Sequence, residues 1–239
     1  MKKISAILLA VMLVFAVAGQ ASAAFENNHL VQVVHNSADK EFGVDLGDIG
    51  TIDMSGTNVL LAPVGSVNFG ALGSYAELNV GFFGADTAAY QNWIATTKTT
   101  DPLIAPAQLL NFENGASSVQ ATYQSDPSQS YNQPGTYGSI MNLNGVAEGA
   151  YAGWNLHQAD GESGLADLAS TGYVDMYLYH WSFSTLDKGP DAGTDYTGIL
   201  RLYANGSTVL NPSAVPIPGA AILLGSGLIG LVGIRRRNG

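Results

Sequence analysis

Cysteine is absent from the 239-residue chain, which excludes disulfide bonds and thiolate metal sites. Basic residues are also scarce, because residues 24–214 hold 19 acidic side chains and four basic ones, a formal charge of −15. A surface without a stripe of lysine or arginine cannot neutralise phosphate groups, so we expect no nucleic-acid partner. Stability must come from a hydrophobic core, and a chain of this length can bury one.

Sequence signatures of catalysis and of cofactor binding are missing as well. The four histidines, His29, His35, His157 and His180, show no H-E-x-x-H or other close chelating spacing, and neither a G-x-S-x-G elbow nor a P-loop occurs. We therefore expect no metal, no cofactor and no enzymatic activity. Calcium bound by oxygen ligands in the segment 187–195 is the alternative to a solvated turn there, although its spacing is not that of an EF-hand loop. A carbohydrate-active hydrolase stays open as a less favoured alternative, because its carboxylate pair is defined by distance in space rather than by sequence.

The N-terminus has the three parts of a secretory signal peptide. Two lysines follow the first methionine, residues 4–18 form an apolar run, and the small residues Ala21 and Ala23 precede Ala24. Signal peptidase cleaves after such small residues, which predicts a signal peptide over residues 1–23 and a mature chain that begins at Ala24.

The C-terminus combines a proline motif, an uncharged run and a basic end. These parts are Val215, Pro216, Ile217 and Pro218, then residues 220–234, then Arg235, Arg236 and Arg237. Fifteen helical residues rise only about 22 Å, against roughly 30 Å of hydrocarbon, so this is a short transmembrane helix. The arginines stay in the cytoplasm by the positive-inside rule, which places the body of the protein outside the membrane.

This tail resembles the PEP-CTERM sorting signal, in the variant whose tripeptide is Pro-Ile-Pro or Pro-Leu-Pro. The matching elements are the proline motif, the run at residues 223–231 and the three arginines, together about the last 25 residues. The tail departs from the commonest form at Ile217, where a glutamate often stands. A permanent C-terminal anchor is the alternative, since a span and arginines alone have the same pattern.

The resemblance implies how the protein is exported, processed and located, and does not imply a catalytic or binding function. A membrane protease of the exosortase type recognises such a tail and cleaves near the proline motif. The resemblance thus implies a protein that is exported from a bacterial cell, is held in the inner membrane by its C-terminal helix until this cleavage, and ends at the cell surface or in the extracellular polysaccharide matrix of a biofilm. Members of the family share the tail and differ in the body.

Residues 24–214 have the pattern of one all-β domain. Short β-prone runs alternate with Gly, Asn, Asp, Ser and Pro, which favours a single antiparallel β-sandwich or jelly roll. We expect a loop at residues 126–138, a short helix within 161–169, and a tight turn at Asn205 and Gly206. The predicted strands span residues 30–35, 58–62, 66–69, 78–83, 107–112, 118–123, 139–143, 173–183, 197–203 and 207–210.

The predicted strand at 173–183 has the clearest local pattern. Alternation puts aliphatic side chains on one face and a row of aromatic ones on the other. The aromatic row is either packed against the rest of the fold or a platform on which sugar rings stack. The row consists of Tyr173, Asp175, Tyr177, Tyr179, Trp181 and Phe183, and the aliphatic face consists of Val174, Met176 and Leu178.

Three functions fit these observations, in descending order. The first is a non-enzymatic structural or adhesive protein of the cell surface or matrix. The second is a secreted glycan-binding module that uses the aromatic row, with extracellular polysaccharide as its partner. The third is the carbohydrate-active hydrolase.

Overall fold

A computed structural model of the chain describes residues 25–36, 40–100, 106–125, 161–182, 185–187 and 195–213. The predicted signal peptide, sorting tail and transmembrane helix lie outside these residues, as do Phe183, the loop at 126–138 and the strand at 139–143. Within the described residues, no helix is long and apolar enough to cross a membrane.

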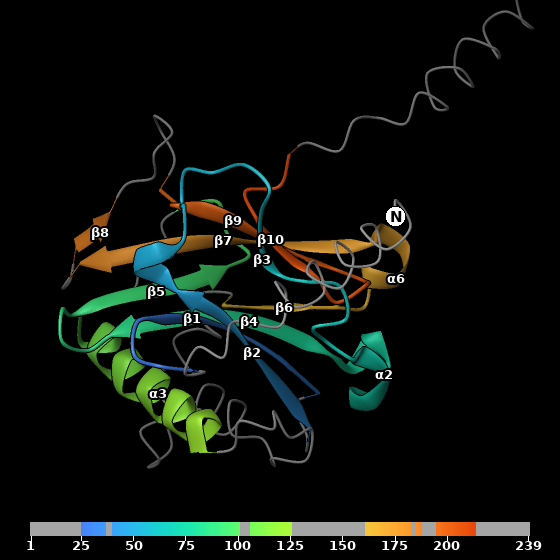
Figure 1. Cartoon of the computed structure of the whole chain (residues 1–239), viewed down its shortest axis with the longest axis horizontal. Helices are drawn as coiled ribbons and strands as arrows, with labels where there is room; N and C mark the ends of the chain where they lie inside the picture. The colour runs from blue at the N-terminus through green and yellow to red at the C-terminus, as the bar shows by residue number, and fades with distance from the viewer. Residues whose placement is uncertain are drawn as a thin grey trace, which may run out of the picture.

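All strands of the described part belong to one antiparallel sheet (Figure 1). Its main path runs in the order β2-β1-β4-β5-β7-β9-β10-β3, while β6 pairs with β4 and β8 with β7. The strands are β1 (His29–His35), β2 (Glu41–Asp48), β3 (Val59–Ala62), β4 (Asn79–Asp86), β5 (Gln91–Thr96), β6 (Glu162–Gly164), β7 (Tyr173–Ser182), β8 (Thr185–Asp187), β9 (Gly198–Tyr203) and β10 (Thr208–Leu210). The described helices are η1 (Ile49–Thr51), α2 (Phe69–Leu72), η2 (Tyr75–Glu77), α3 (Pro106–Ser125) and α6 (Leu168–Thr171).

The sheet curls into a nearly closed, barrel-like form. A side-chain hydrogen bond from Thr208 of β10 to Gln32 of β1 crosses the interior, and both residues are fully buried. The inward residues of successive strands, such as Leu30, Phe82 and Leu200, form one apolar core. The expectation of an antiparallel β domain is therefore confirmed at this coarser level, although one curled sheet packs on itself where two stacked sheets were expected.

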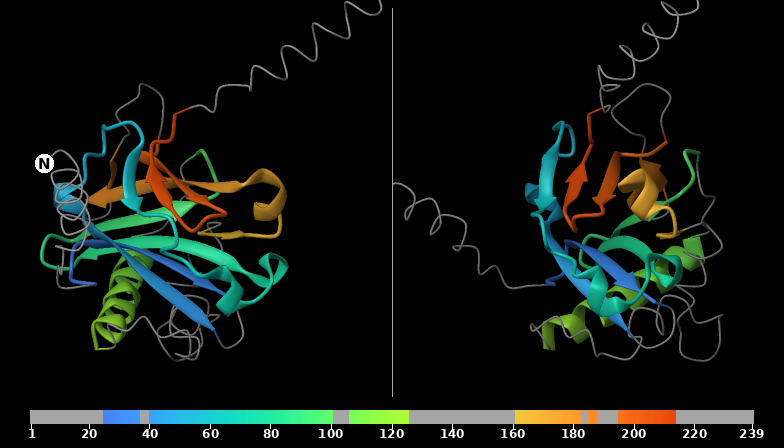
Figure 2. Two further views of the ribbon diagram at one scale, coloured as in Figure 1. Left: turned by 45° about the vertical axis from the view of Figure 1, so that its right-hand side comes forward. Right: turned by 90° about the vertical axis from the view of Figure 1, so that its right-hand side faces the viewer.

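A second apolar layer lies outside the sheet, where α3 covers part of its outer face (Figures 1 and 2). Its buried residues recur at intervals of three and four, the spacing of one face of a helix. They pack on outward residues such as Val31 and Phe83. The buried apolar side chains of α3 are Leu109, Phe112, Ala116, Val119 and Tyr123.

Several sequence predictions needed correction. The strands predicted at 107–112 and 118–123 are wrong, because both segments belong to α3. Residues 66–69 form a turn that leads into α2 rather than a strand, and β2 and β5 were missed. Within 161–169 the chain forms β6 and the start of α6. The tight turn is confirmed, with Gly206 at φ +81° and its N–H donating to the carbonyl of Tyr203 at 2.9 Å.

Candidate functional site

The residues of the predicted aromatic row on β7 differ in how deeply they are buried. Met176 and Leu178 point into the core of the curled sheet, as alternation requires. On the outer face, Tyr179 and Trp181 are 0% and 2% exposed, because they belong to the layer beneath α3. The sequence prediction could not include this cover, since it treated the α3 segment as strands.

The remaining three residues of the row stay at the surface. Tyr173, Asp175 and Tyr177 are each half-buried. They lie on the part of β7 that pairs with β9, and β9 and β10 lie on the side of the sheet away from α3 (Figures 1 and 2).

Strand β9 completes this surface with three residues that the sequence prediction missed. The register places Tyr203 opposite Tyr173, Arg201 opposite Asp175, and Ile199 opposite Tyr177. The signal was present, because the buried Leu200 and Leu202 leave residues 199, 201 and 203 on the outer face by alternation. We call these six residues the tyrosine face: Tyr173, Asp175, Tyr177, Ile199, Arg201 and Tyr203.

An ion pair stands at the centre of the tyrosine face. The Nε and Nη2 atoms of Arg201 donate to the two carboxylate oxygens of Asp175 at 2.6 and 2.7 Å, a bidentate geometry that suits the planar guanidinium. Hydrogen bonding to Asp175 is the main cause that raises the pKa of Arg201 above its ordinary value, so the group stays charged. The charge is compensated within the pair.

Two tyrosine rings flank this guanidinium group. Its central carbon lies 3.8 Å from the ring centroid of Tyr173 and 5.9 Å from that of Tyr203, and the first contact has cation–π geometry. Arg201 is only 7% exposed, yet its Nη1 atom has no hydrogen-bond partner among the described residues. The site thus combines oriented aromatic rings with a buried guanidinium group that they flank.

The other end of the tyrosine face is formed by Tyr177. Its ring centroid lies 4.9 Å from that of Tyr196, which precedes β9. Burial is the first cause that raises the pKa of Tyr177, and the nearby Asp175 and Tyr196 raise it further. The hydroxyl group of Tyr177 is therefore neutral at physiological pH and can donate a hydrogen bond.

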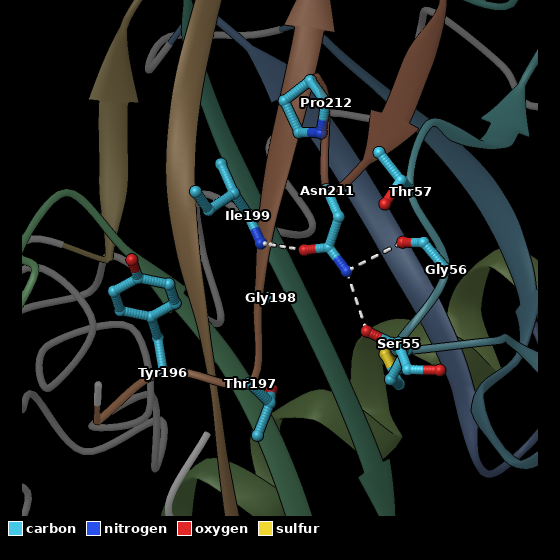
Figure 3. A pocket seen from close by; sticks show the side chains of 10 residues that line it. Ser55, Gly56, Thr57, Tyr196, Thr197, Gly198, Ile199, Asn211 and Pro212 are labelled. Carbon is cyan, nitrogen blue, oxygen red and sulfur yellow. Dashed lines mark hydrogen bonds between the residues drawn. The ribbon is translucent and has the colours of Figure 1, made fainter. Parts of the chain in front are cut away.

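A cavity of about 350 Å³ opens beside this end (Figure 3). It is framed by the loop at residues 54–57, by residues 196–199 and by Asn211 and Pro212. None of the lining residues is charged. A pair of carboxylates for glycoside hydrolysis is therefore not found in this cavity.

The histidines of the described part form separate pairs with carboxylates. Nδ1 of His29 lies 2.8 Å from Asp45, and Nδ1 of His180 lies 2.8 Å from Asp187. Nowhere in the described ranges do three or more His, Asp or Glu side chains gather in a way that could hold a metal ion.

Comparison of the chain with protein-family models, with curated proteins and with solved structures finds no match. The residues predicted for processing, at the signal-peptide cleavage site and in the sorting tail, lie outside the described residues. The tyrosine face and the adjoining cavity are therefore the features on which a function can be argued from geometry.

Proposed function

We propose that this protein is an exported, non-enzymatic protein of the cell surface or extracellular matrix that adheres to polysaccharide through its tyrosine face. The observation that carries the proposal is the stack of Tyr173 and Tyr203 about the Arg201–Asp175 pair. Rings that are held in place and half-exposed offer flat apolar surfaces at little entropic cost.

The polar groups between these rings suit a ligand that carries many hydroxyl groups. The carboxylate of Asp175, whose side chain is 27% exposed, can accept from a hydroxyl. A sugar ring presents apolar C–H faces to an aromatic ring and hydroxyls at its edge. The tyrosine face has both kinds of partner side by side.

The charge of the domain favours one class of polysaccharide over another. The Arg201–Asp175 pair has no net charge, while residues 24–214 carry a formal charge of −15, so the domain repels anionic polymers at long range. A neutral polysaccharide is therefore the favoured partner, and uronate-rich chains are disfavoured.

The route to that partner is the one predicted from the two ends of the chain. Signal peptidase removes residues 1–23, the short C-terminal helix holds the protein in the inner membrane, and an exosortase-like protease cleaves near Pro216 and Pro218. The tyrosine face lies between residues 173 and 203, before this motif in the sequence, so cleavage near the motif leaves all of its residues in the mature protein.

Binding is tested with matrix polysaccharide from the native cell, separated by anion exchange into neutral and acidic fractions. In affinity electrophoresis of the full chain we expect retardation by the neutral fraction alone. Replacing both Tyr173 and Tyr203 with Ala should weaken binding at least tenfold, about 1.4 kcal/mol. Tyr90→Ala is the matched control, because Tyr90 is an exposed tyrosine in the turn between β4 and β5. Equal retardation of the double variant, or no retardation by the neutral fraction, would contradict the proposal.

Processing is tested separately by the intact mass and location of the protein in its native cell. The wild type should lack residues 1–23 and the three terminal arginines, and should be found at the surface or in the matrix. A variant with Pro216 and Pro218 both replaced by Ala should keep its arginines and stay in the inner membrane. A mature wild-type protein that still carries Arg235, Arg236 and Arg237 would contradict the processing step.

A further inference from the structure

The cavity beside the tyrosine face is continuous with it. Ile199 belongs to both, because it stands opposite Tyr177 in the sheet and also lines the cavity. Tyr196 lines the cavity as well, and its ring contacts that of Tyr177. A ligand on the outer face of β7 and β9 therefore reaches the cavity at the first residues of β9.

The cavity is held open by a fixed frame of hydrogen bonds (Figure 3). The side-chain oxygen of Asn211 accepts from the N–H of Ile199 at 3.0 Å. Its amide nitrogen donates to the carbonyls of Met54 at 2.8 Å and Gly56 at 3.1 Å. These bonds tie β9, the residue after β10 and the loop at 54–57 together, so the frame is formed before any ligand arrives.

Gly198, one of the lining residues, lies where the chain packs closely on Leu210 and Asn211. A Cβ atom at this position would lie 2.8 Å from Cδ1 of Leu210 and 3.2 Å from Oδ1 of Asn211. A larger residue fits only if the end of Leu210 moves aside and Asn211 shifts slightly. The glycine thus helps to preserve the frame around Asn211.

The lining and size of the cavity define the kind of group that it takes. Hydroxyl-bearing and apolar side chains, such as those of Thr57, Tyr196 and Ile199, surround it without any charge. Its volume is at the lower end of the range for small-molecule sites, roughly 300–1,000 Å³, so it suits one small neutral unit rather than a polymer. In Figure 3, Tyr196 and Ile199 stand on one side and Ser55 and Thr57 on the other, with Asn211 between them.

We infer that this cavity binds the terminal sugar unit of a neutral saccharide chain, while the following units lie along the tyrosine face. The inference rests on the proposed function, since it concerns the same surface. It states that this surface binds the end of a saccharide chain rather than its internal units. An end-binding site takes one protein per linear chain whatever the length of that chain. A platform without an end subsite takes more proteins as the chain grows.

The stoichiometry of the wild-type protein decides between these two modes. The probe is a set of linear oligosaccharides, released from the neutral matrix fraction by partial hydrolysis and separated by length, and titrated calorimetrically into the full chain. We expect one protein per chain at every length. A number of bound proteins that rises with length would overturn the inference and leave the proposed function standing, whereas no binding at any length would overturn both.

Variants locate the end subsite. Thr57→Trp fills the cavity and should weaken binding at least tenfold, while Val64→Trp, at an exposed position outside the cavity, should leave it unchanged. Tyr196→Ala removes a wall without adding bulk and should also weaken binding. Tyr173→Ala should weaken binding but keep one protein per chain. Unchanged affinity in both cavity variants would contradict the inference, and thermal melting of each variant confirms that it is folded.

Discussion

Arg201 is almost completely buried, although arginine is among the residues that proteins bury least often. The two hydrogen bonds to Asp175 and the contact with the ring of Tyr173 compensate for the lost hydration of its charged guanidinium group. The same contacts restrict Tyr173, because its ring is stacked on a group that is itself anchored to the neighbouring strand. The ion pair thus fixes the aromatic surface through its geometry and adds no net charge to it.

His180 is a second residue whose surroundings set its behaviour. Its ring stacks on that of Trp93 at 4.4 Å with an interplanar angle of 8°, and its Nδ1 contacts Asp187 at 2.8 Å. Burial lowers the pKa of His180 below 6.5, and the neighbouring Asp187 opposes this shift only in part. The neutral imidazole is therefore the form that the folded protein prefers.

This preference makes stability depend on pH. The unfolded chain binds a proton at His180 near pH 6.5, and the folded chain binds it at a lower pH. The contribution of His180 to stability is complete above pH 6.5 and is lost as the pH falls from 6.5 through the folded-state pKa. We expect urea unfolding of the full chain to show a smaller fall in the free energy of unfolding between pH 7.5 and 5.5 for His180→Gln than for the wild type. The other histidines are common to both proteins, and identical pH slopes would contradict this assignment.

At the scale of elements, α3 determines which part of the outer sheet face is available. Tyr179 and Trp181, at one end of β7, belong to the buried apolar cluster that includes the stripe of α3, while β9 borders the other end, where Tyr173 and Tyr177 stay half-buried. The helix is held by its apolar stripe and by a buried hydrogen bond of 2.5 Å from the hydroxyl of Tyr123 to Glu41 of β2. One strand therefore contributes both to the buried layers and to the half-exposed tyrosine face.

The stripe of α3 predicts the cost of removing one contact. Phe112 is fully buried in the layer between helix and sheet, so Phe112→Ala should destabilise the protein by about 3–5 kcal/mol. Leu110→Ala is the control on the opposite side of the same helix, where the side chain is 55% exposed, and it should change stability by less than about 0.5 kcal/mol. Urea denaturation of the full chain measures both variants. Equal unfolding midpoints would show that α3 does not pack as described.

The elements that sequence reasoning found are those whose pattern is local. Strand β7 was predicted to within one residue because its aliphatic and aromatic faces alternate over ten residues. Strand β2 was missed because Asp45 and two glycines share the face opposite its buried Phe42, Val44 and Leu46, which lowers its apparent β propensity.

Helix α3 and the full tyrosine face could not be predicted from the pattern of any single short segment. The stripe of α3 includes Ala116 and is interrupted by glycine and serine, so short windows read parts of it as strands. The partnership of Asp175 with Arg201 depends on the register between β7 and β9, which are separated by residues 183–197. Tertiary pairing, rather than composition, brings these two charges together.

At the scale of the whole molecule, the dominant property is negative charge. Residues 24–214 hold 19 acidic side chains against four basic ones. Such an excess repels anionic polymers, and it also destabilises the compact state by self-repulsion. A domain of this size has a radius of gyration of about 16 Å, so most of its carboxylates interact when the Debye length is roughly 30 Å, at 0.01 M salt.

Salt should therefore stabilise this protein. Raising NaCl from 0.01 to 0.15 M shortens the Debye length to about 8 Å, which leaves only neighbouring charges in contact. The Arg201–Asp175 pair is largely buried and loses little, whereas repulsion across the surface is mostly removed. We expect the melting temperature of the full chain at pH 7 to rise by about 5 °C, measured by scanning calorimetry. The same series at pH 4.5, near the sequence isoelectric point, is the control, because the net charge there is close to zero and the rise should disappear. A melting temperature that stays constant or falls with salt at pH 7 would mean that the acidic side chains are already compensated in the folded state.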